Sequence, residues 1–415
     1  MSTVAPAREL LEVDVAIVGG GMVGASLAAA LAGSGRRLLL VESVPFGAEA
    51  QPSFDERTTA LGNTSRRIFS SLGVWQAMEP EAAAIRAIHV SEAGRFGVAR
   101  LSAAEQGIDA FGYVVPNRRI GAALWEKLAA ARDLELCAPA RVQDVAISAE
   151  RVRFTLVNES GAALRVAAHL VVGADGAHSQ IRAAAGIRAQ VEDYDQVAVV
   201  ANVAADRSHH GWAFERFTAA GPLAVLPRHD GTFAVIWACT PQHSRELLAL
   251  DESAYLAQLQ GLFGWRAGRF VRAGRRVSYP LKLTRATRTV ATRTVLIGNA
   301  AQALHPVAGQ GFNLGLRDAA MLAEVIAAAR TDPGAPRLLQ RFAAWRARDR
   351  RGVVGFTDGL VRLFGDSRPE VALLRNLGLL MFDLTPPAKS ALARVSSGFG
   401  GPAPRLARGL PVHRV

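Results

Sequence analysis

Apolar residues recur along the chain with periods that alternate between those of strands and those of helices. Residues 13–18 form a short apolar run, glycines follow, and residues 25–32 are small residues typical of a closely packed helix. Residues 38–41 form a second apolar run, which ends in an acid. A strand, a turn, a helix and a second strand predict a parallel β-sheet, because parallel strands are buried on both faces.

The segment from residue 64 to residue 185 changes periodicity several times. Apolar residues recur at helical spacing in two stretches and alternate with polar residues in others. We therefore expect helices over residues 64–78 and 119–131, paired strands over 85–98, and further strands over 141–156 and 170–172.

A different pattern begins near residue 196. Short alternating strands with aromatic residues continue to residue 279, which is typical of an antiparallel sheet outside the parallel one. The parallel pattern returns at residues 295–297 and leads into a helix over 312–329. From residue 333 the chain is mainly helical. The residues after Gly398 are rich in Gly, Pro and Arg, and we expect them to fray.

The length of 415 residues fits two interleaved domains and a tail. The antiparallel part is an insertion between distant segments of the parallel domain. We expect a nucleotide-binding domain from residues 1–80, 100–185 and 285–345, a substrate-binding sheet from 81–99 and 186–284, and a helical C-terminal region from 346–415.

Composition narrows the class of protein. The formal net charge is +12, carried mostly by arginine, and could favour anionic lipid surfaces or nucleotide phosphates. No nucleic-acid-binding module is visible, so nucleic acid is not an expected partner. Cys137 and Cys239 form no CxxC motif, which favours two reduced thiols in a cytoplasmic protein. No signal peptide and no bilayer-spanning run is apparent, and peripheral contact with the inner membrane stays open.

The glycines after the first strand fit the pattern GxGxxG. Gly19 allows a tight turn, Gly21 lets the backbone approach a pyrophosphate, and Gly24 lets the helix pack closely on the sheet. The phosphates would face free N–H groups at the helix N-terminus. Glu42 follows the second strand, ~20 residues after the glycines, where a carboxylate that binds the ribose is expected. An acid at this position argues against a ligand with a 2′-phosphate. The motif does not separate FAD from NAD.

Two later segments also join a buried strand to a glycine turn and a helix. Residues 171–182 contain the turn Asp175-Gly176, and residues 296–318 contain a proline loop and a Gly-x-Gly turn. The helix start in the second segment offers N–H groups and a positive dipole end, which suits the negative charge of a reduced flavin around N1 and O2. Gly311 and Phe312 would supply those backbone donors, and Pro306 would shape the loop beside the ring.

These segments carry a resemblance to a known family. Asp175-Gly176 followed by Ser179 and Arg182 resembles the second fingerprint of the flavoprotein aromatic hydroxylases, which has also been linked to the reduced nicotinamide cofactor. Residues 296–318 resemble the subgroup that hydroxylates polyprenylated phenols in ubiquinone biosynthesis, and the match is closest to the 2-polyprenyl-6-methoxyphenol hydroxylases. Most relatives have Asp where this chain has Asn299. The hydroxylases of this subgroup often carry Asn there.

The resemblance implies an α/β fold with a glutathione-reductase-like, Rossmann-type FAD-binding domain, an inserted antiparallel substrate sheet and a helical tail. Arg57, after Phe54-Asp55-Glu56, and Arg118, after a short strand, stand where the family places arginines that contact FAD. The cofactor-binding residues that it implies are Gly19, Gly21, Gly24, Glu42, Arg57, Arg118, Asp175, Gly298, Asn299, Pro306, Gly309, Gly311, Phe312 and Asn313.

The resemblance also implies a reaction. FAD is reduced by NAD(P)H or another donor and reacts with O2 to give a C4a-hydroperoxide, which transfers OH to the ring of a polyprenylated phenol. Pro306 and His305 are the candidate catalytic residues, with positioning of the flavin loop as the competing interpretation for His305. No metal-ligand constellation surrounds His305 in the sequence. A ubiquinone-biosynthesis protein complex and a membrane surface are further candidate partners.

Several alternatives stay open at this point. The apolar C-terminal stretch over residues 371–395 is either an amphipathic element that meets a membrane or partner, or a helix packed on the FAD domain. The other functions to weigh are hydroxylation of a soluble aromatic compound, reduction of isoprenoid double bonds, and a flavin-holding scaffold without turnover.

Overall fold

A computed structural model describes residues 10–45, 57–366, 368–396 and 403–412. Its first sheet has eight strands, and the five central ones are parallel as predicted. The strand order is β18 (Val290–Ala291), β19 (Thr294–Leu296), β11 (Ala163–Gly173), β1 (Leu10–Val18), β2 (Leu38–Val41) and β8 (Leu134–Cys137), with β10 (Val152–Asn158) and β9 (Ala140–Ile147) added antiparallel on β11.

Both faces of this sheet are buried, which explains its continuous apolar runs. Val15 and Ile17 of β1 point into one core with helices α1 (Met22–Leu31) and α8 (Gln310–Ala327). Ala16 and Val18 point into a second core with β9, β10 and α5 (Gln180–Ala184). Successive residues of a strand face opposite sides, so an unbroken apolar run serves two cores at once.

The inserted sheet is antiparallel except at one pair. Its order is β20 (Gln302–Ala303), β17 (Val277–Ala286), β12 (Ala189–Ala205), β15 (Phe233–Cys239), β14 (Gly221–Pro227), β13 (Trp212–Thr218), β5 (Ala87–Glu92) and β6 (Val98–Ser102), with β16 (Phe270–Ala273) on β12. β13 and β5 pair in parallel. Helices α6 (Pro241–Ala249) and α7 (Glu252–Phe263) pack into the core on one face of this sheet. β6 lies across the boundary that we expected at residue 99.

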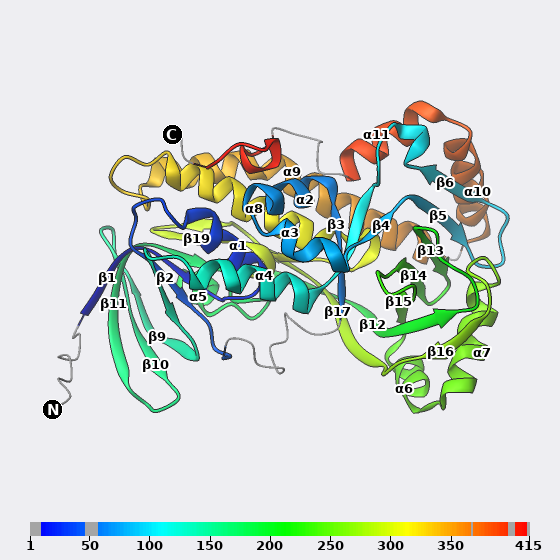
Figure 1. The fold of residues 1–415 in the computed structure, drawn as a ribbon, viewed down its shortest axis with the longest axis horizontal. Helices are drawn as coiled ribbons and strands as arrows, with labels where there is room; N and C mark the ends of the chain where they lie inside the picture. The colour runs from blue at the N-terminus through cyan, green and yellow to red at the C-terminus, as the bar shows by residue number, and fades with distance from the viewer. Residues whose placement is uncertain (1–9, 46–56, 367, 397–402, 413–415) are drawn as a thin grey trace.

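A small sheet and the remaining helices join the two large sheets. The small sheet has the order β3 (Thr58–Gly62), β7 (Gly112–Pro116) and β4 (Ala83–Ile85). The helices are α2 (Asn63–Ser71), α3 (Trp75–Met78), α4 (Asn117–Ala129), α9 (Pro336–Gly365), α10 (Pro369–Asp383) and α11 (Pro386–Ser396). Figure 1 shows α10 beside β6, with α11 at the same end of the molecule, opposite to β9 and β10. The predicted α/β class with an inserted antiparallel sheet and a helical C-terminal region is confirmed.

Two details of the sequence prediction were wrong. The helix expected over residues 64–78 is broken after Ser71, because Gly73 adopts φ +73°, a left-handed conformation that ends helices. The end of the chain does not fray throughout. Leu406 and Ala407 are buried in the main core beside α2, and the Leu406 carbonyl accepts a hydrogen bond from the Ser71 hydroxyl.

None of the helices in the described part of the chain combines the length and the hydropathy needed to cross a bilayer.

Candidate active site

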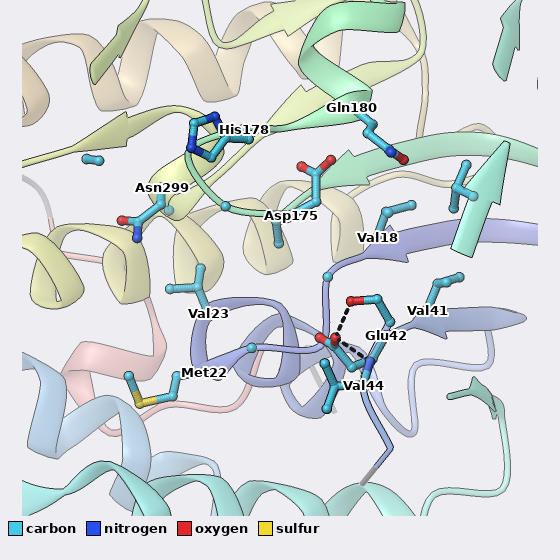
Figure 2. Close-up of a pocket in the computed structure, with 18 of the residues that line it drawn as sticks. Val18, Met22, Val23, Val41, Glu42, Val44, Asp175, His178, Gln180 and Asn299 are labelled. Atoms are coloured by element: carbon cyan, nitrogen blue, oxygen red, sulfur yellow. Dashed lines mark hydrogen bonds between the residues drawn. The ribbon is translucent and has the colours of Figure 1, made fainter. Parts of the chain in front are cut away.

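A cleft lies at the carboxyl ends of β1, β2 and β11, where the three segments singled out in the sequence meet. Its volume is about 620 Å³. Figure 2 shows Glu42 and Val41 at one end, Asp175 in the middle, and Asn299 with Val23 at the other end. The residues from those segments that line it include Gly19, Gly21, Glu42, Asp175, Gly298, Asn299, Gly311 and Phe312.

The first glycine turn is packed so closely that side chains are excluded. A Cβ on Gly19 would lie 2.4 Å from the Ala174 carbonyl oxygen, and Gly19 has φ +102°. A Cβ on Gly24 would lie 1.9 Å from the Gly19 carbonyl oxygen. Gly24 is therefore buried between α1 and the turn, while Gly19 and Gly21 face the cleft. No side chain of the described residues caps the start of α1, and its first turn holds no acid, so its N–H groups suit an anion.

Glu42 is held at the end of β2 by its own chain. Its Oε2 accepts a hydrogen bond from the Gly20 N–H at 2.7 Å, and its Oε1 accepts one from the Val44 N–H at 3.0 Å. Glu42 as a residue is 8% exposed and forms part of the cleft wall (Figure 2). These contacts fix the carboxylate in one orientation, and its remaining lone pairs can accept from a ligand hydroxyl.

Asp175 offers an acceptor that the described chain leaves unused. Its Oδ2 accepts from the Ile181 N–H at 3.1 Å, whereas its buried Oδ1 has no hydrogen-bond partner among the described residues. The other two residues of the fingerprint hold the turn itself. Ser179 caps α5 by accepting from the Arg182 N–H at 2.9 Å. The Arg182 guanidinium donates to the carbonyls of Ala177 and Ala300.

The third segment brings a second helix start to the cleft. Gly309 has φ +59° and precedes the first turn of α8, which holds no acid and which no side chain in the described part of the chain caps. Gly311 and Phe312 line the cleft from this turn. Asn313 instead points away from the cleft. Its Oδ1 accepts from the Gly62 N–H at 2.9 Å, and its Nδ2 donates to the Gly309 carbonyl at 2.7 Å, which ties α8 to β3.

His305 and Pro306 lie outside the lining of the cleft. His305 is 1% exposed, and burial lowers its pKa from 6.5 to about 4, so the ring is neutral. Its Nδ1 accepts from the Val307 N–H at 3.2 Å, which leaves the proton on Nε2, 3.1 Å from the Gln196 Oε1. The ring thus fastens the loop to β12. Pro306 is exposed, and its carbonyl accepts from the Gly309 N–H at 2.9 Å.

The two arginines carried over from the resemblance are not among the residues that line the cleft. Arg57 stacks over the Tyr279 ring, with its guanidinium carbon 4.2 Å from the ring centroid. Arg118 pairs with Glu81 at 2.6 Å. The segment Phe54-Asp55-Glu56 lies outside the described residues.

The sequence analysis missed several residues of the cleft wall, four of which carry polar side chains or come from a strand that it did not connect with the site. Arg141 and Val142 reach it from β9. His178 reaches it from the turn before α5, and Gln180 from the first residue of α5 (Figure 2). The last two stand inside the fingerprint segment and could have been found there. Nothing in the alternating pattern of β9 marks its first residues as part of a site.

A second cavity, of about 430 Å³, lies beside the first turn of α8. The first turn of α8 lines both, since Gly311 and Phe312 face the cleft and Gln310 and Asn313 face the second cavity. The other lining residues are apolar apart from Glu215: Ala60, Leu61, Gly62, Ile85, Ile88, Val90, Ala99, Leu101, Phe111, Gly112, Phe217, Val307, Phe356, Leu360, Phe364, Leu379, Phe382, Leu392 and Ala393. We call this space the apolar cavity.

The cleft fits a dinucleotide. Two helix starts offer backbone N–H groups, Glu42 and the unpartnered Asp175 Oδ1 offer acceptors for hydroxyl groups, and the glycines allow close approach. This fold and this cleft together define a dinucleotide-binding α/β protein. In agreement, the family model described as an FAD binding domain matches residues 12–357.

Relatives narrow the class further. The chain is 38% identical to ubiquinone hydroxylase UbiL of Rhodospirillum rubrum over 406 residues, which cover 96% of this chain and 93% of that protein. It is 32% identical to the 3-demethoxyubiquinol 3-hydroxylase of Escherichia coli, over 88% of this chain and 94% of that one. The chain belongs to the FAD-binding-domain family and, within it, to the FAD-dependent hydroxylases of ubiquinone biosynthesis.

Solved structures show the same fold. The p-nitrophenol 4-monooxygenase PnpA of Pseudomonas putida DLL-E4 superposes with a TM-score of 0.78 at 20% identity, covering 95% of this chain and 99% of that chain. PqsL of Pseudomonas aeruginosa, in complex with 2-aminobenzoylacetate, gives a TM-score of 0.73 at 21% identity, covering 89% and 100%.

Proposed function

We propose that this chain hydroxylates the aromatic ring of a polyprenylated phenol in ubiquinone biosynthesis, with FAD as cofactor and with NAD(P)H and O2 as co-substrates. One observation carries the proposal: adjacent residues of the first turn of α8 line the dinucleotide cleft and the apolar cavity. A ring held in the cavity would lie next to a flavin held in the cleft, and an isoprenoid chain suits walls of aliphatic and aromatic side chains.

The residues of the cleft would bind and orient the cofactor. The N–H groups at the start of α1 would receive the pyrophosphate, Glu42 and Asp175 would accept from hydroxyl groups, and the N–H groups of Gly311 and Phe312 would face the flavin ring. When bound, FAD supplies the redox chemistry that takes two electrons from NAD(P)H and passes one oxygen atom of O2 to the ring. The apolar cavity excludes water from that exchange.

The direct test is turnover by the purified FAD-loaded protein. With NAD(P)H, O2 and a prenylated phenol, we expect substrate-stimulated oxygen uptake and a product heavier by one oxygen atom in mass spectrometry. Reduction of isoprenoid double bonds would instead raise the mass by hydrogen alone and consume no oxygen. A scaffold without turnover would bind FAD and give no product. Either of these results would refute the proposal.

A substitution inside the apolar cavity tests where the substrate binds. Ala99 is 2% exposed and lies opposite Val90 across β5 and β6. Ala99→Leu adds bulk to the cavity and is expected to lower kcat/KM for the prenylated phenol about tenfold, with flavin content unchanged. Ala146→Leu, on an exposed face of β9, is the matched control. Equal kcat/KM in the two variants would place the substrate elsewhere.

The outer face of α10 supports contact with a membrane, where a prenylated substrate resides. One side of α10 lines the apolar cavity through Leu379 and Phe382. The other side exposes five large apolar residues, Leu373, Leu374, Leu377, Leu380 and Met381, and Leu384 directly after the helix is exposed as well. We expect the protein to sediment with phospholipid vesicles and Leu374→Glu to weaken that binding. Val191→Glu, at an equally exposed apolar residue of β12, is the control. Binding that needs a partner protein rather than vesicles would contradict this assignment.

A further inference from the structure

One carboxyl group interrupts the apolar cavity. Glu215 lies on β13, between Ala213 and Phe217 on the same face of the strand, and its register partners are Ala224 and Val90. Both of those strand neighbours and both of those register partners are apolar. A glutamate at such a position lowers the stability of the fold, so its presence calls for a functional reason.

Glu215 has no partner in the described part of the chain. Its Oε1 is buried without a hydrogen bond, and no ion pair reaches the carboxyl group. Burial raises the pKa of Glu215 from 4.5 to about 7. The residue as a whole keeps some accessible surface, as a residue that lines a cavity must. An unpartnered acceptor inside an apolar cavity is suited to a ligand that brings its own hydroxyl group.

The other polar groups around the cavity are engaged elsewhere. Gln310 and Asn313 are the only other polar side chains among the described lining residues, and Asn313 is bonded to β3 and to its own helix. The charged groups on surrounding elements are paired outside the cavity: Glu92 with Arg375, Arg100 with Asp383, and Arg362 with Asp358 and Glu192. Arg216, next to Glu215 on β13, donates to the Ser91 hydroxyl and to the Leu262 carbonyl. His89, on the neighbouring strand β5, has a pKa lowered to about 4 by burial.

We propose that the Glu215 carboxylate accepts the proton of the substrate's phenolic hydroxyl group, an inference that rests on the proposed function. The phenolic O–H bond breaks, an O–H bond forms on a carboxyl oxygen of Glu215, and the electron pair stays on the phenolic oxygen. That pair raises the electron density of the ring at the carbons ortho and para to it, one of which gains the new oxygen. The proton returns to solvent after the product leaves, so Glu215 acts as a general base and the step needs no added oxidant or reductant.

A binding experiment without turnover isolates the hydroxyl contact. The oxidised FAD-loaded protein is titrated with a prenylated phenol and with its methyl ether, and binding is followed by the flavin absorbance. We expect the wild type to prefer the phenol about tenfold to hundredfold, because a carboxylate accepts a hydrogen bond only from the free hydroxyl group. Glu215→Leu keeps the site filled and apolar, and should bind both ligands equally.

Turnover of the phenol then tests the proton transfer. Glu215→Gln preserves size and is expected to lower kcat about a hundredfold, with KM changed only severalfold. Wild-type kcat should rise with pH through about 7, as the carboxyl group ionises, and this rise should be missing in Glu215→Gln. Glu159→Gln, at an exposed turn, is the matched control and should behave as wild type.

The outcomes separate this role from the proposed function. If wild type hydroxylates the phenol and Glu215→Gln matches it in kcat and pH profile, the role of Glu215 is refuted and the proposed function stands. The role of Glu215 would also be refuted if wild type and Glu215→Leu preferred the phenol over the methyl ether by the same factor. A wild type that binds FAD and hydroxylates no phenol would overturn the proposed function and this role together.

Discussion

The buried neutral histidine of the flavin loop should make the protein sensitive to mild acid. His305 has a pKa of about 4 in the folded chain, against 6.5 for an exposed histidine. Because the unfolded state binds the proton more readily, the contribution of His305 to stability is complete above pH 6.5 and is lost as the pH falls from 6.5 to 4. Protonation of His305 lowers the free energy of unfolding by about 3 kcal/mol in total, and about 2 kcal/mol of this is lost by pH 5.

Urea denaturation of wild type and His305→Gln at pH 8 and pH 5 measures this quantity. Glutamine can still accept from the Val307 N–H and donate to Gln196, but it does not titrate. The variant should therefore lose about 2 kcal/mol less than wild type on acidification. His89 is also buried with a pKa of about 4, and its contribution cancels because it is present in both proteins.

A second histidine provides the control. His210 is exposed with φ 45°, a conformation that asparagine tolerates, so His210→Asn should keep the full acid sensitivity. If His305→Gln shows the same pH dependence as wild type, the ring is not held neutral by burial and the reasoning fails.

Three further substitutions test other parts of the structure. Gly24→Ala places a Cβ 1.9 Å from the Gly19 carbonyl oxygen and should yield protein without flavin absorbance, whereas Gly352→Ala, with open space around it, should stay yellow. The Arg346 guanidinium is 0% exposed and lies 2.5 Å from Asp318, and Asp318→Ala leaves it with Asp349 as its remaining carboxylate. Urea denaturation should show that the free energy of unfolding falls by about 3 kcal/mol. Leu406→Ala should also cost about 3 kcal/mol, and an unchanged melting temperature would mean that the segment after residue 402 does not dock on α2.

The turns and helix starts that depend on residues close together in the sequence could be predicted from the sequence alone. The turn at residues 19–24 lies between a strand and a helix, so its glycines and its place in the fold could be inferred together. The helix start at Gly311 could be inferred for the same reason. The break at Gly73 was harder, because Ile68, Leu72 and Trp75 keep helical spacing and are all buried although the helix ends between them.

The apolar cavity could not be predicted, because only tertiary contacts assemble it. Its walls come from β3, β5, β6, β13, α8, α9 and the two last helices. Strand periodicity alone would place Glu215 toward solvent, since its neighbour Phe214 lies in the core with α7. Packing of α9 and α10 against the other face of the sheet encloses it instead.

The wall of the apolar cavity has a consequence for how such enzymes diversify. The match to the FAD-binding-domain family ends at residue 357, while Leu360, Phe364, Leu379 and Phe382 of the wall follow it. Part of the cavity wall therefore lies outside the stretch that binds the nucleotide, while β3, β5, β6, β13 and α8 supply the rest from within that stretch. Exchange of the residues after 357 between paralogues is expected to change which ring enters the apolar cavity while the residues that bind FAD stay the same. New substrate specificities can then arise without changes in the FAD-binding cleft.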